Sequence, residues 1–228
     1  MKDYLDDLRP ALAGTPTTPQ SQSRQGFYAK CGKRAFDLIL AILLLPLIVP
    51  ALMALWLLAR RDGGPGFFGH TRIGRNGQAF KCWKVRTMVM GAEDKLQSYL
   101  ADNPSAAAEW ARDHKLTNDP RITQIGAFLR RTSLDELPQI WNVLTGEMSF
   151  VGPRPIVQAE LPKYGAAAGT YLSQKPGITG LWQVSGRNDV TYTERVAMDI
   201  DYSLRGSFRL DIKLVLRTAA SVFGGTGR

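Results

Sequence analysis

Residues 35–59, AFDLILAILLLPLIVPALMALWLLA, decide what kind of fold this chain can adopt. Asp37 is the only charged residue among them. A straight helix of this length extends about 37 Å, which is enough to cross a bilayer. The core helix of a soluble protein usually keeps a polar face, and this segment has none. We therefore expect the segment to lie in a membrane.

Two features of the same segment argue against a simple crossing. Pro46 and Pro50 lie in its middle, where each removes a backbone hydrogen-bond donor and favours a kink. Basic residues flank both of its ends: Lys30, Lys33, Arg34, Arg60 and Arg61. Because basic flanks favour the cytoplasmic side, both ends are expected there. The sequence thus predicts a re-entrant membrane helix over residues 26–60, bent into a hairpin between Pro46 and Pro50.

The remainder of the chain divides into a tail and one larger region. Residues 1–25 are rich in Pro, Thr, Ser and Gln, a composition typical of a disordered tail. Residues 61–228 are expected to form one cytosolic, membrane-associated domain of the α+β class, mostly helical, with a small strand element at residues 79–88. The expected helices cover residues 92–115, 121–130, 133–145, 191–204 and 207–223.

The C-terminal region carries a basic stripe. Arg205, Arg209, Lys213 and Arg217 follow one another at intervals of four residues. Such a helix either lies on an anionic membrane surface or presents an ordinary solvated face, and both readings stay open. Beside an apolar membrane segment, the interfacial reading is favoured.

The overall charge points to an anionic partner. The chain carries a net charge of +9, from 29 Lys and Arg against 20 Asp and Glu. Nucleic acid is a poor candidate, because the apolar segment does not suit it and no helix-turn-helix, zinc or RNA-binding motif appears. A membrane surface or a phosphorylated substrate fits better. The two cysteines have neither metal-ligand nor disulfide-framework spacing, which favours a reducing compartment.

The stretch SLDELPQIWNVLTGEMSFVGPRP, residues 133–155, holds the candidate chemistry. Ser133 followed by Glu136 is the pattern of a capping box, and Trp141 falls on the expected apolar face. Adjacent carboxylates with no Cys or His nearby also suit a hard cation, most plausibly Mg²⁺. A carboxylate can attack phosphorus when cations offset the charges. The stretch therefore indicates either plain helix capping or phosphoryl transfer, with Asp135 and Glu136 as nucleophile and metal ligand.

At this point the chain resembles the bacterial sugar transferases, monotopic phosphoglycosyl transferases that act on polyprenyl phosphate. The resemblance runs from about Lys33 to the C-terminus. It rests on KRAFDLILA, FKCWKVRTM, DPRITQIGAFLRRTSLDELPQIWNVLTGEMSFVGPRP, KPGITGLWQVSGRND and LDIKLVLRT. It implies transfer of a sugar 1-phosphate from a UDP-sugar to undecaprenyl phosphate, with release of UMP. It also implies a covalent phosphosugar on Asp135, and Mg²⁺ held by Glu136 with Asp135 beside it.

The resemblance also implies a set of substrate-binding residues. Arg130 and Arg154 match family arginines near phosphate, and the basic strand and the loop WQVSGRN add further candidates: Lys84, Arg86, Gln183, Arg187 and Asn188. Trp182 in that loop either stacks on a base or anchors at the membrane interface, and the sequence does not separate the two.

Among family members, the short form with SGRNDV resembles enzymes that prime exopolysaccharide synthesis at the bacterial inner membrane, with the catalytic domain on the cytoplasmic face. Galactose 1-phosphate is the favoured group and glucose 1-phosphate the next. An N-acetylhexosamine 1-phosphate donor and a non-catalytic membrane scaffold are the alternatives. The sequence leaves the oligomeric state open, with a homo-oligomer among the options.

Overall fold

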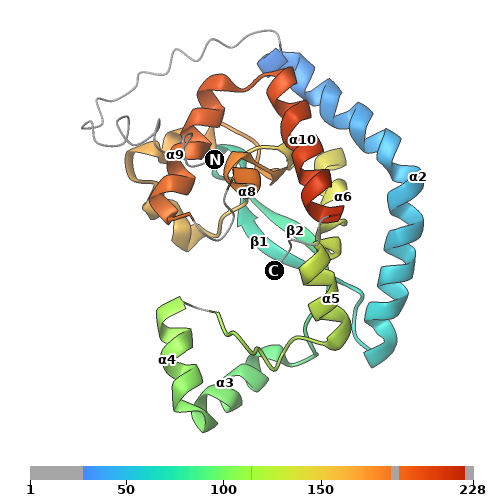
Figure 1. Ribbon diagram of the computed structural model, residues 1–228, viewed down its shortest axis with the longest axis vertical. Coiled ribbons are helices and arrows are strands. Elements are labelled where there is room, and N and C mark those ends of the chain that lie inside the picture. Colours follow the sequence, from blue (N-terminus) through green and yellow to red (C-terminus); the bar gives the residue numbers. More distant parts are fainter. Residues whose placement is uncertain (1–27, 114, 186–189, 224–228) are drawn as a thin grey trace.

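The computed structural model describes residues 28–113, 115–185 and 190–223 (Figure 1). The tail expected over residues 1–25 lies outside the described part. Most of the described chain is helical, and its strands form two small sheets. The expected mostly helical α+β class is confirmed.

The apolar segment forms one helix, α2 (Lys33–Ala59), which follows the π-helical turn η1 (Tyr28–Gly32). The helix continues past Pro46 and Pro50 and curves along one side of the molecule (Figure 1). The hairpin expected between these prolines is therefore not confirmed. Among the described residues, one helical run, Lys33–Asp62, is long and apolar enough to cross a membrane.

Both ends of α2 are bonded to the globular body. Near the first end, Lys33 Nζ lies 2.7 Å from Asp211 Oδ2, and Arg34 donates to the Val143 carbonyl oxygen at 2.6 Å. At the other end, Arg86 donates to the Ala59 carbonyl oxygen at 2.6 Å and pairs with Asp62 in the turn η2 (Arg60–Asp62). The apolar helix is thus held against one body over its whole length.

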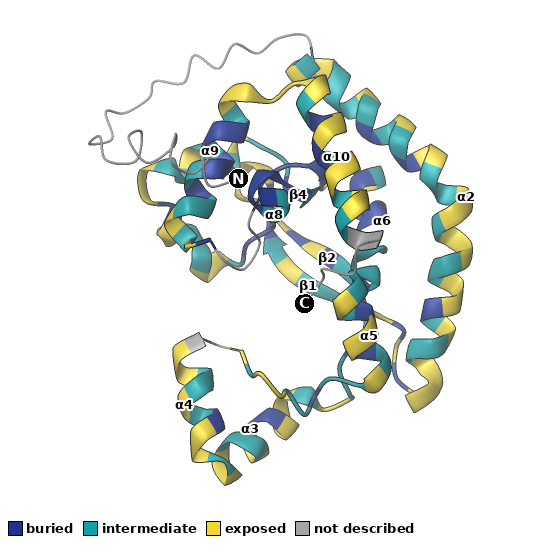
Figure 2. Cartoon of the chain, in the orientation of Figure 1, coloured by how far each residue is buried: buried dark blue, intermediate teal, exposed yellow. Residues whose placement is uncertain are grey.

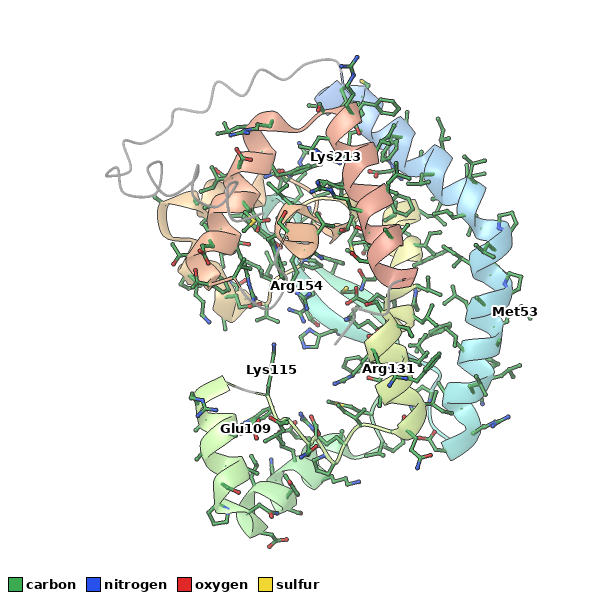
Figure 3. All side chains as sticks on the ribbon, in the orientation of Figure 1. Met53, Glu109, Lys115, Arg131, Arg154 and Lys213 are labelled. Carbon is green, nitrogen blue, oxygen red and sulfur yellow. The ribbon has the colours of Figure 1, made fainter. Side chains whose placement is uncertain are left out.

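The outward side of α2 is apolar and exposed, as Figure 2 shows in yellow. Met53 is 62% exposed and points away from the body (Figure 3). Its exposed apolar neighbours on the helix are Ile39, Ile42, Leu43, Leu47, Val49 and Leu57. A soluble protein rarely leaves so many large apolar side chains together in water. This side of α2 therefore has the character of a lipid-contacting surface.

A β-hairpin packs against the stretch that holds the acidic pair, through contacts of its second strand with residues 134–136 and 139–145. Strands β1 (Phe67–Ile73) and β2 (Ala79–Val85) are antiparallel, with Phe68 opposite Lys84 and Arg72 opposite Phe80. The turn η3 (Arg75–Gly77) places Asn76 and Gly77 at φ 59° and 76°, the left-handed region that an Asn-Gly pair tolerates. The expected strand at residues 79–88 is confirmed over its first seven residues.

A second sheet pairs β3 (Ser149–Val151) in parallel with β4 (Gly177–Thr179). These strands approach so closely that a Cβ built on Gly177 would lie 2.1 Å from the Gly152 nitrogen. Glycine is therefore required where the two strands meet. The sheet carries the chain segments that continue to Arg154 on one side and to Gln183 on the other.

The remaining elements are helical. Residues 92–115 form two helices, α3 (Ala92–Asp102) and α4 (Pro104–Asp113), because the chain breaks before Pro104. Figure 1 shows them as an arm extending from the body. The expected terminal helices are confirmed as α9 (Tyr192–Arg205) and α10 (Phe208–Phe223). The others are α5 (Gln124–Thr132), η4 (Leu134–Glu136), α6 (Gln139–Thr145), η5 (Gln158–Ala167), α7 (Ala168–Leu172) and α8 (Leu181–Ser185).

The main core joins α2 to the rest of the molecule. It contains Ala41 from α2, Phe80 from β2, Val143 from α6, Met198 from α9 and Leu214 from α10. Trp141, which the helical pattern places on the packing face of α6, is 60% exposed. That expectation is wrong because α6 instead buries Ile140 and Val143.

Candidate active site

The acidic pair lies in a tight turn between two helices. Ser133 ends α5 at φ 57°, and the 3₁₀ turn η4 then carries Asp135 and Glu136. The Ser133 side chain makes no capping hydrogen bond, so the prediction of a capping box at Ser133 and Glu136 is wrong. Glu136 turns away from the backbone because it has a stronger partner, the Lys84 ammonium group. Helix α6 begins only at Gln139, after Pro138.

Lys84 of β2 links the two carboxylates. Its Nζ lies 2.7 Å from Glu136 Oε1 and 3.7 Å from Asp135 Oδ2. The Asp135 side chain is 10% exposed, whereas that of Glu136 is 27% exposed. One ammonium group therefore holds both acids from the strand side of the site.

The environment shifts the pKa values of the two acids in opposite directions. Burial raises the pKa of Asp135, and the charge of Glu136 adds to the rise while Lys84 and Arg130 offset part of it. Burial also opposes ionisation of Glu136, but Lys84, Arg154 and Arg72 outweigh it and lower the pKa of that group. Glu136 is thus held as a stable anion, and Asp135 is a more basic carboxylate than usual.

A pocket opens beside Glu136. It is lined by residues of the β-hairpin, of α6, of the segment after β3, of β4 and of α8: Arg72, Cys82, Lys84, Glu136, Gln139, Arg154, Pro155, Gly177, Ile178 and Gln183. Three of these side chains are cationic and one is anionic. The lining of the pocket is therefore electropositive, which suits an anionic group.

Four of the expected site residues line this pocket: Lys84, Glu136, Arg154 and Gln183. Asp135 adjoins it through Lys84. Arg130 donates from Nε to Thr87 Oγ1 at 2.9 Å. Burial lowers the pKa of Arg130, and the charge of the nearby Asp135 offsets part of that change.

Arg86 lies apart from this group. Its guanidinium contacts Asp62 and the carbonyl oxygens of Ala59, Pro65 and Met88, where it holds the end of α2. Arg187 and Asn188 fall outside the residues that the structure describes.

Trp182 has neither of the roles that the sequence left open. Its side chain is 5% exposed and belongs to the main core. The guanidinium carbon of Arg154 lies 5.8 Å from its ring centroid, and that of Arg195 lies 4.6 Å away. Both distances fit cation–π contact, so Trp182 supports Arg154 from within the protein.

The sequence reasoning missed Arg72, Cys82 and Gln139 among the residues that line the pocket. The signal for Arg72 was available in the Asn-Gly turn, which predicts a hairpin around residues 76 and 77. In the register of that hairpin, Arg72 faces Phe80, and positions 80, 82 and 84 share one side of β2. No local pattern indicates Cys82 or Gln139.

The residues fit a bound Mg²⁺ ion of the phosphate-bridged kind. Such ions use one or two protein carboxylates and complete their coordination with phosphate oxygens and water. The described residues contain no cluster of three acidic, His or Cys side chains, so a fully protein-coordinated site is not present among them. Glu136 and Asp135 supply the two carboxylates, and Glu136 is the more exposed of them.

A cationic pocket beside a carboxylate pair defines a site for a phosphorylated ligand, and comparisons with known proteins show the family to which the chain belongs. Residues 28–225 match the family model described as bacterial sugar transferase, and the chain belongs to that family. It is 51% identical over 195 residues to the UDP-galactose-lipid carrier transferase of Erwinia amylovora, covering 86% of this chain and 41% of that protein.

Two further relatives differ in the coverage of their own length. The exopolysaccharide production protein ExoY of Sinorhizobium fredii is 50% identical over 191 residues, which are 83% of this chain and 84% of that protein. The UDP-glucose:undecaprenyl-phosphate glucose-1-phosphate transferase of Escherichia coli is 38% identical over 221 residues, 93% of this chain and 44% of that protein. The chain thus spans less than half the length of the Erwinia and Escherichia proteins.

Proposed function

We propose that this protein transfers a hexose 1-phosphate, preferably galactose 1-phosphate, from a UDP-sugar to undecaprenyl phosphate. The observation that carries the proposal is the pair Asp135 and Glu136 held by Lys84 at the edge of a cationic pocket. A phosphate-bearing donor suits the cations, and an isoprenoid acceptor suits the exposed apolar face of α2. The names of the Erwinia and Escherichia relatives support galactose and glucose as the sugars.

The first step begins with the Asp135 carboxylate. One of its oxygens attacks the phosphorus atom that bears the sugar, while the bond from that phosphorus to the bridging oxygen breaks. UMP leaves with the bridging oxygen and the electron pair. Because the pKa of Asp135 is raised, its ionised form is a stronger nucleophile than an ordinary carboxylate.

In the second step, a phosphate oxygen of undecaprenyl phosphate attacks the same phosphorus, and Asp135 leaves as a free carboxylate. Lys84 and Arg154 hold the phosphoryl oxygens through both steps. Glu136, with Asp135 beside it, would hold Mg²⁺ together with the donor phosphates, and the bound ion supplies further neutralisation of their charge.

The position of α2 supports a membrane-surface enzyme whose catalytic body stays on one side. A helix that crosses the bilayer separates its ends by about 30 Å of hydrocarbon. Here both ends are bonded to the same body, through Lys33 and Arg34 at one end and through Ala59 and Asp62 at the other. We place residues 61–228 on the cytoplasmic face of the inner membrane, where UDP-sugars are made.

The test is UMP release by the detergent-solubilised protein with undecaprenyl phosphate and Mg²⁺. UDP-galactose, UDP-glucose and the UDP-N-acetylhexosamines serve as donors. We expect release from a hexose donor, and a loss of at least about 1000-fold in Asp135→Asn because the nucleophile is removed. Asp94→Asn, which removes an exposed acid on the arm, is the matched control and should keep full activity.

The other outcomes are equally informative. Release from an N-acetylhexosamine donor alone would replace the sugar and keep the chemistry. No release from any donor by folded protein would favour the scaffold. Release that persists in Asp135→Asn would overturn the covalent step.

A further inference from the structure

We infer that Arg72 is a further substrate-binding residue, which joins Lys84 and Arg154 in holding the diphosphate of the donor. This inference rests on the function proposed above. The motif around the acidic pair does not include Arg72, which lies in β1, more than sixty residues before that pair. Its assignment comes from the three-dimensional arrangement.

The hairpin brings Arg72 to the pocket. Arg72 is paired with Phe80, and the neighbouring positions on the same side of β2 are Cys82 and Lys84. All but Phe80 line the pocket, together with Glu136 and Arg154. The Arg72 side chain is only 20% exposed, so its guanidinium borders the pocket without extending into bulk water.

The contacts of Arg72 leave part of its guanidinium available. Among the described residues, it donates from Nη1 to the Pro155 carbonyl oxygen at 3.3 Å, and the same atom lies 3.6 Å from Glu160 Oε2. A guanidinium carries five N–H donors in a planar fork. These contacts orient the group from one side, which is the arrangement needed to present the remaining donors to a phosphate.

The charge balance also favours an anion at this position. Arg72, Lys84 and Arg154 face a single pocket carboxylate, Glu136. Glu160, the other acid near Arg72, also accepts a hydrogen bond from the Val157 nitrogen and so is shared. Burial lowers the pKa of Arg72, with the charge of Arg154 adding to the effect and Glu160 opposing it. A diphosphate between these cations relieves their mutual repulsion.

A purely structural role would give Arg72 a different task. In that case it would fix the segment from Pro155 to Glu160 onto the hairpin, and the ion pair with Glu160 would be the important contact. Glu160→Gln separates the two roles, since it removes the partner charge and leaves Arg72 at the pocket.

The experiment measures UDP binding by calorimetry and the KM for the preferred donor in the full-length solubilised protein. We expect Arg72→Gln to weaken UDP binding and raise KM by about tenfold or more, the loss typical of a charge-assisted phosphate contact. Arg72→Lys should recover part of this loss, because it restores charge but not the fork. Glu160→Gln should stay within about twofold of wild type.

Each outcome bears on one claim. Wild-type affinity in a folded Arg72→Gln protein would overturn the inference and leave the proposed function intact. Equal losses in Arg72→Gln and Glu160→Gln, with equal falls in melting temperature, would also overturn it in favour of the structural role. A wild-type protein that neither binds UDP nor releases UMP would overturn the proposed function itself.

Discussion

Asp135, the proposed nucleophile, is a carboxylate that the fold disfavours in its charged form. Its carboxylate is largely buried, and burial raises its pKa above the ordinary value of 3.8. Above the raised pKa, the folded protein holds a charge that the unfolded chain would solvate better. The residue that carries the proposed chemistry is therefore one that the fold would favour as neutral.

We expect Asp135→Asn to raise the melting temperature at pH 7, because the variant removes a charge that burial disfavours. The folded pKa lies above the unfolded one, so the stability linked to Asp135 is full below pH 3.8 and falls as pH rises through the folded pKa. The advantage of the variant should therefore grow as pH rises above 3.8 and level off above the folded pKa of Asp135.

Thermal unfolding followed by circular dichroism between pH 4 and pH 8 measures this effect. Asp94→Asn, at an exposed position, should follow the wild-type curve throughout. A melting temperature of Asp135→Asn below that of wild type at pH 7 would contradict the stated balance of burial and charge.

At the scale of single residues, the motif predicted several residues that the structure brings together in the candidate site. Asp135, Glu136, Lys84 and Arg154 meet as expected, because the family pattern encodes them directly. Alternation along a strand would place Arg86 on the same side as Lys84, but β2 ends at Val85, and Arg86 instead contacts Asp62 in the turn after α2. Such a difference depends on tertiary packing, which the local sequence does not contain.

At the scale of elements, the parallel contact between β3 and β4 positions two parts of the pocket. The contact depends on Gly177, whose added Cβ would lie 2.1 Å from the Gly152 nitrogen and 2.4 Å from the Thr179 carbonyl oxygen. These are backbone atoms, which cannot move aside as a flexible side chain can. The pairing of the two strands would have to open.

We expect Gly177→Ala to lower the free energy of unfolding by about 3 kcal/mol, at the upper end of the cost of overpacking. Denaturant unfolding of the solubilised protein measures it. Gly169→Ala is the matched control: its Cβ meets nothing within 4 Å, and alanine is the better helix former in α7. It should be neutral or slightly stabilising. Equal stability of the two variants would show that the strands can separate at little cost.

The elements differ in how far the sequence predicts them. Helices α9 and α10 and strand β2 follow local periodic patterns and were predicted nearly to their ends. The prediction of a capping box was wrong because the Glu136 carboxylate accepts a hydrogen bond from Lys84, 52 residues away, instead of from the backbone. The prediction that Trp141 is buried was wrong because the helical pattern marks an apolar face but does not show which part of that face contacts the core.

At the scale of the whole molecule, the central question is how the protein sits in the membrane. The exposed apolar side chains of α2 are joined by others on the body: Phe128 on α5, Trp141 on α6, and Phe208, Ile212 and Leu216 on α10. Aromatic residues with nearby lysine and arginine are typical of a membrane–water interface. This composition supports a body that rests on the bilayer.

We expect both ends of α2 to face the cytoplasm. Cys31 is exposed beside the first end and Cys82 is buried, so the native chain offers one reactive thiol there. In a Cys31→Ser background, Arg61→Cys marks the other end. An impermeant maleimide should label both sites in inside-out vesicles and neither in intact spheroplasts. Labelling of the two ends from opposite sides would establish a spanning helix and overturn this placement.

The bond between Lys33 and Asp211 sets an order of events during synthesis. The two residues are 178 positions apart, and Tyr28 and Tyr202 share the same carboxylate. At a ribosomal rate of about 5–20 residues per second, roughly 10–40 s separate the emergence of the cation and the anion. In the proposed membrane placement, the apolar helix therefore has time to reach the lipid before its contact with Asp211 can form, and α10 is the last described element to be made. A nascent chain that stalls before residue 208 would already carry the membrane helix but could not form the bond between Lys33 and Asp211.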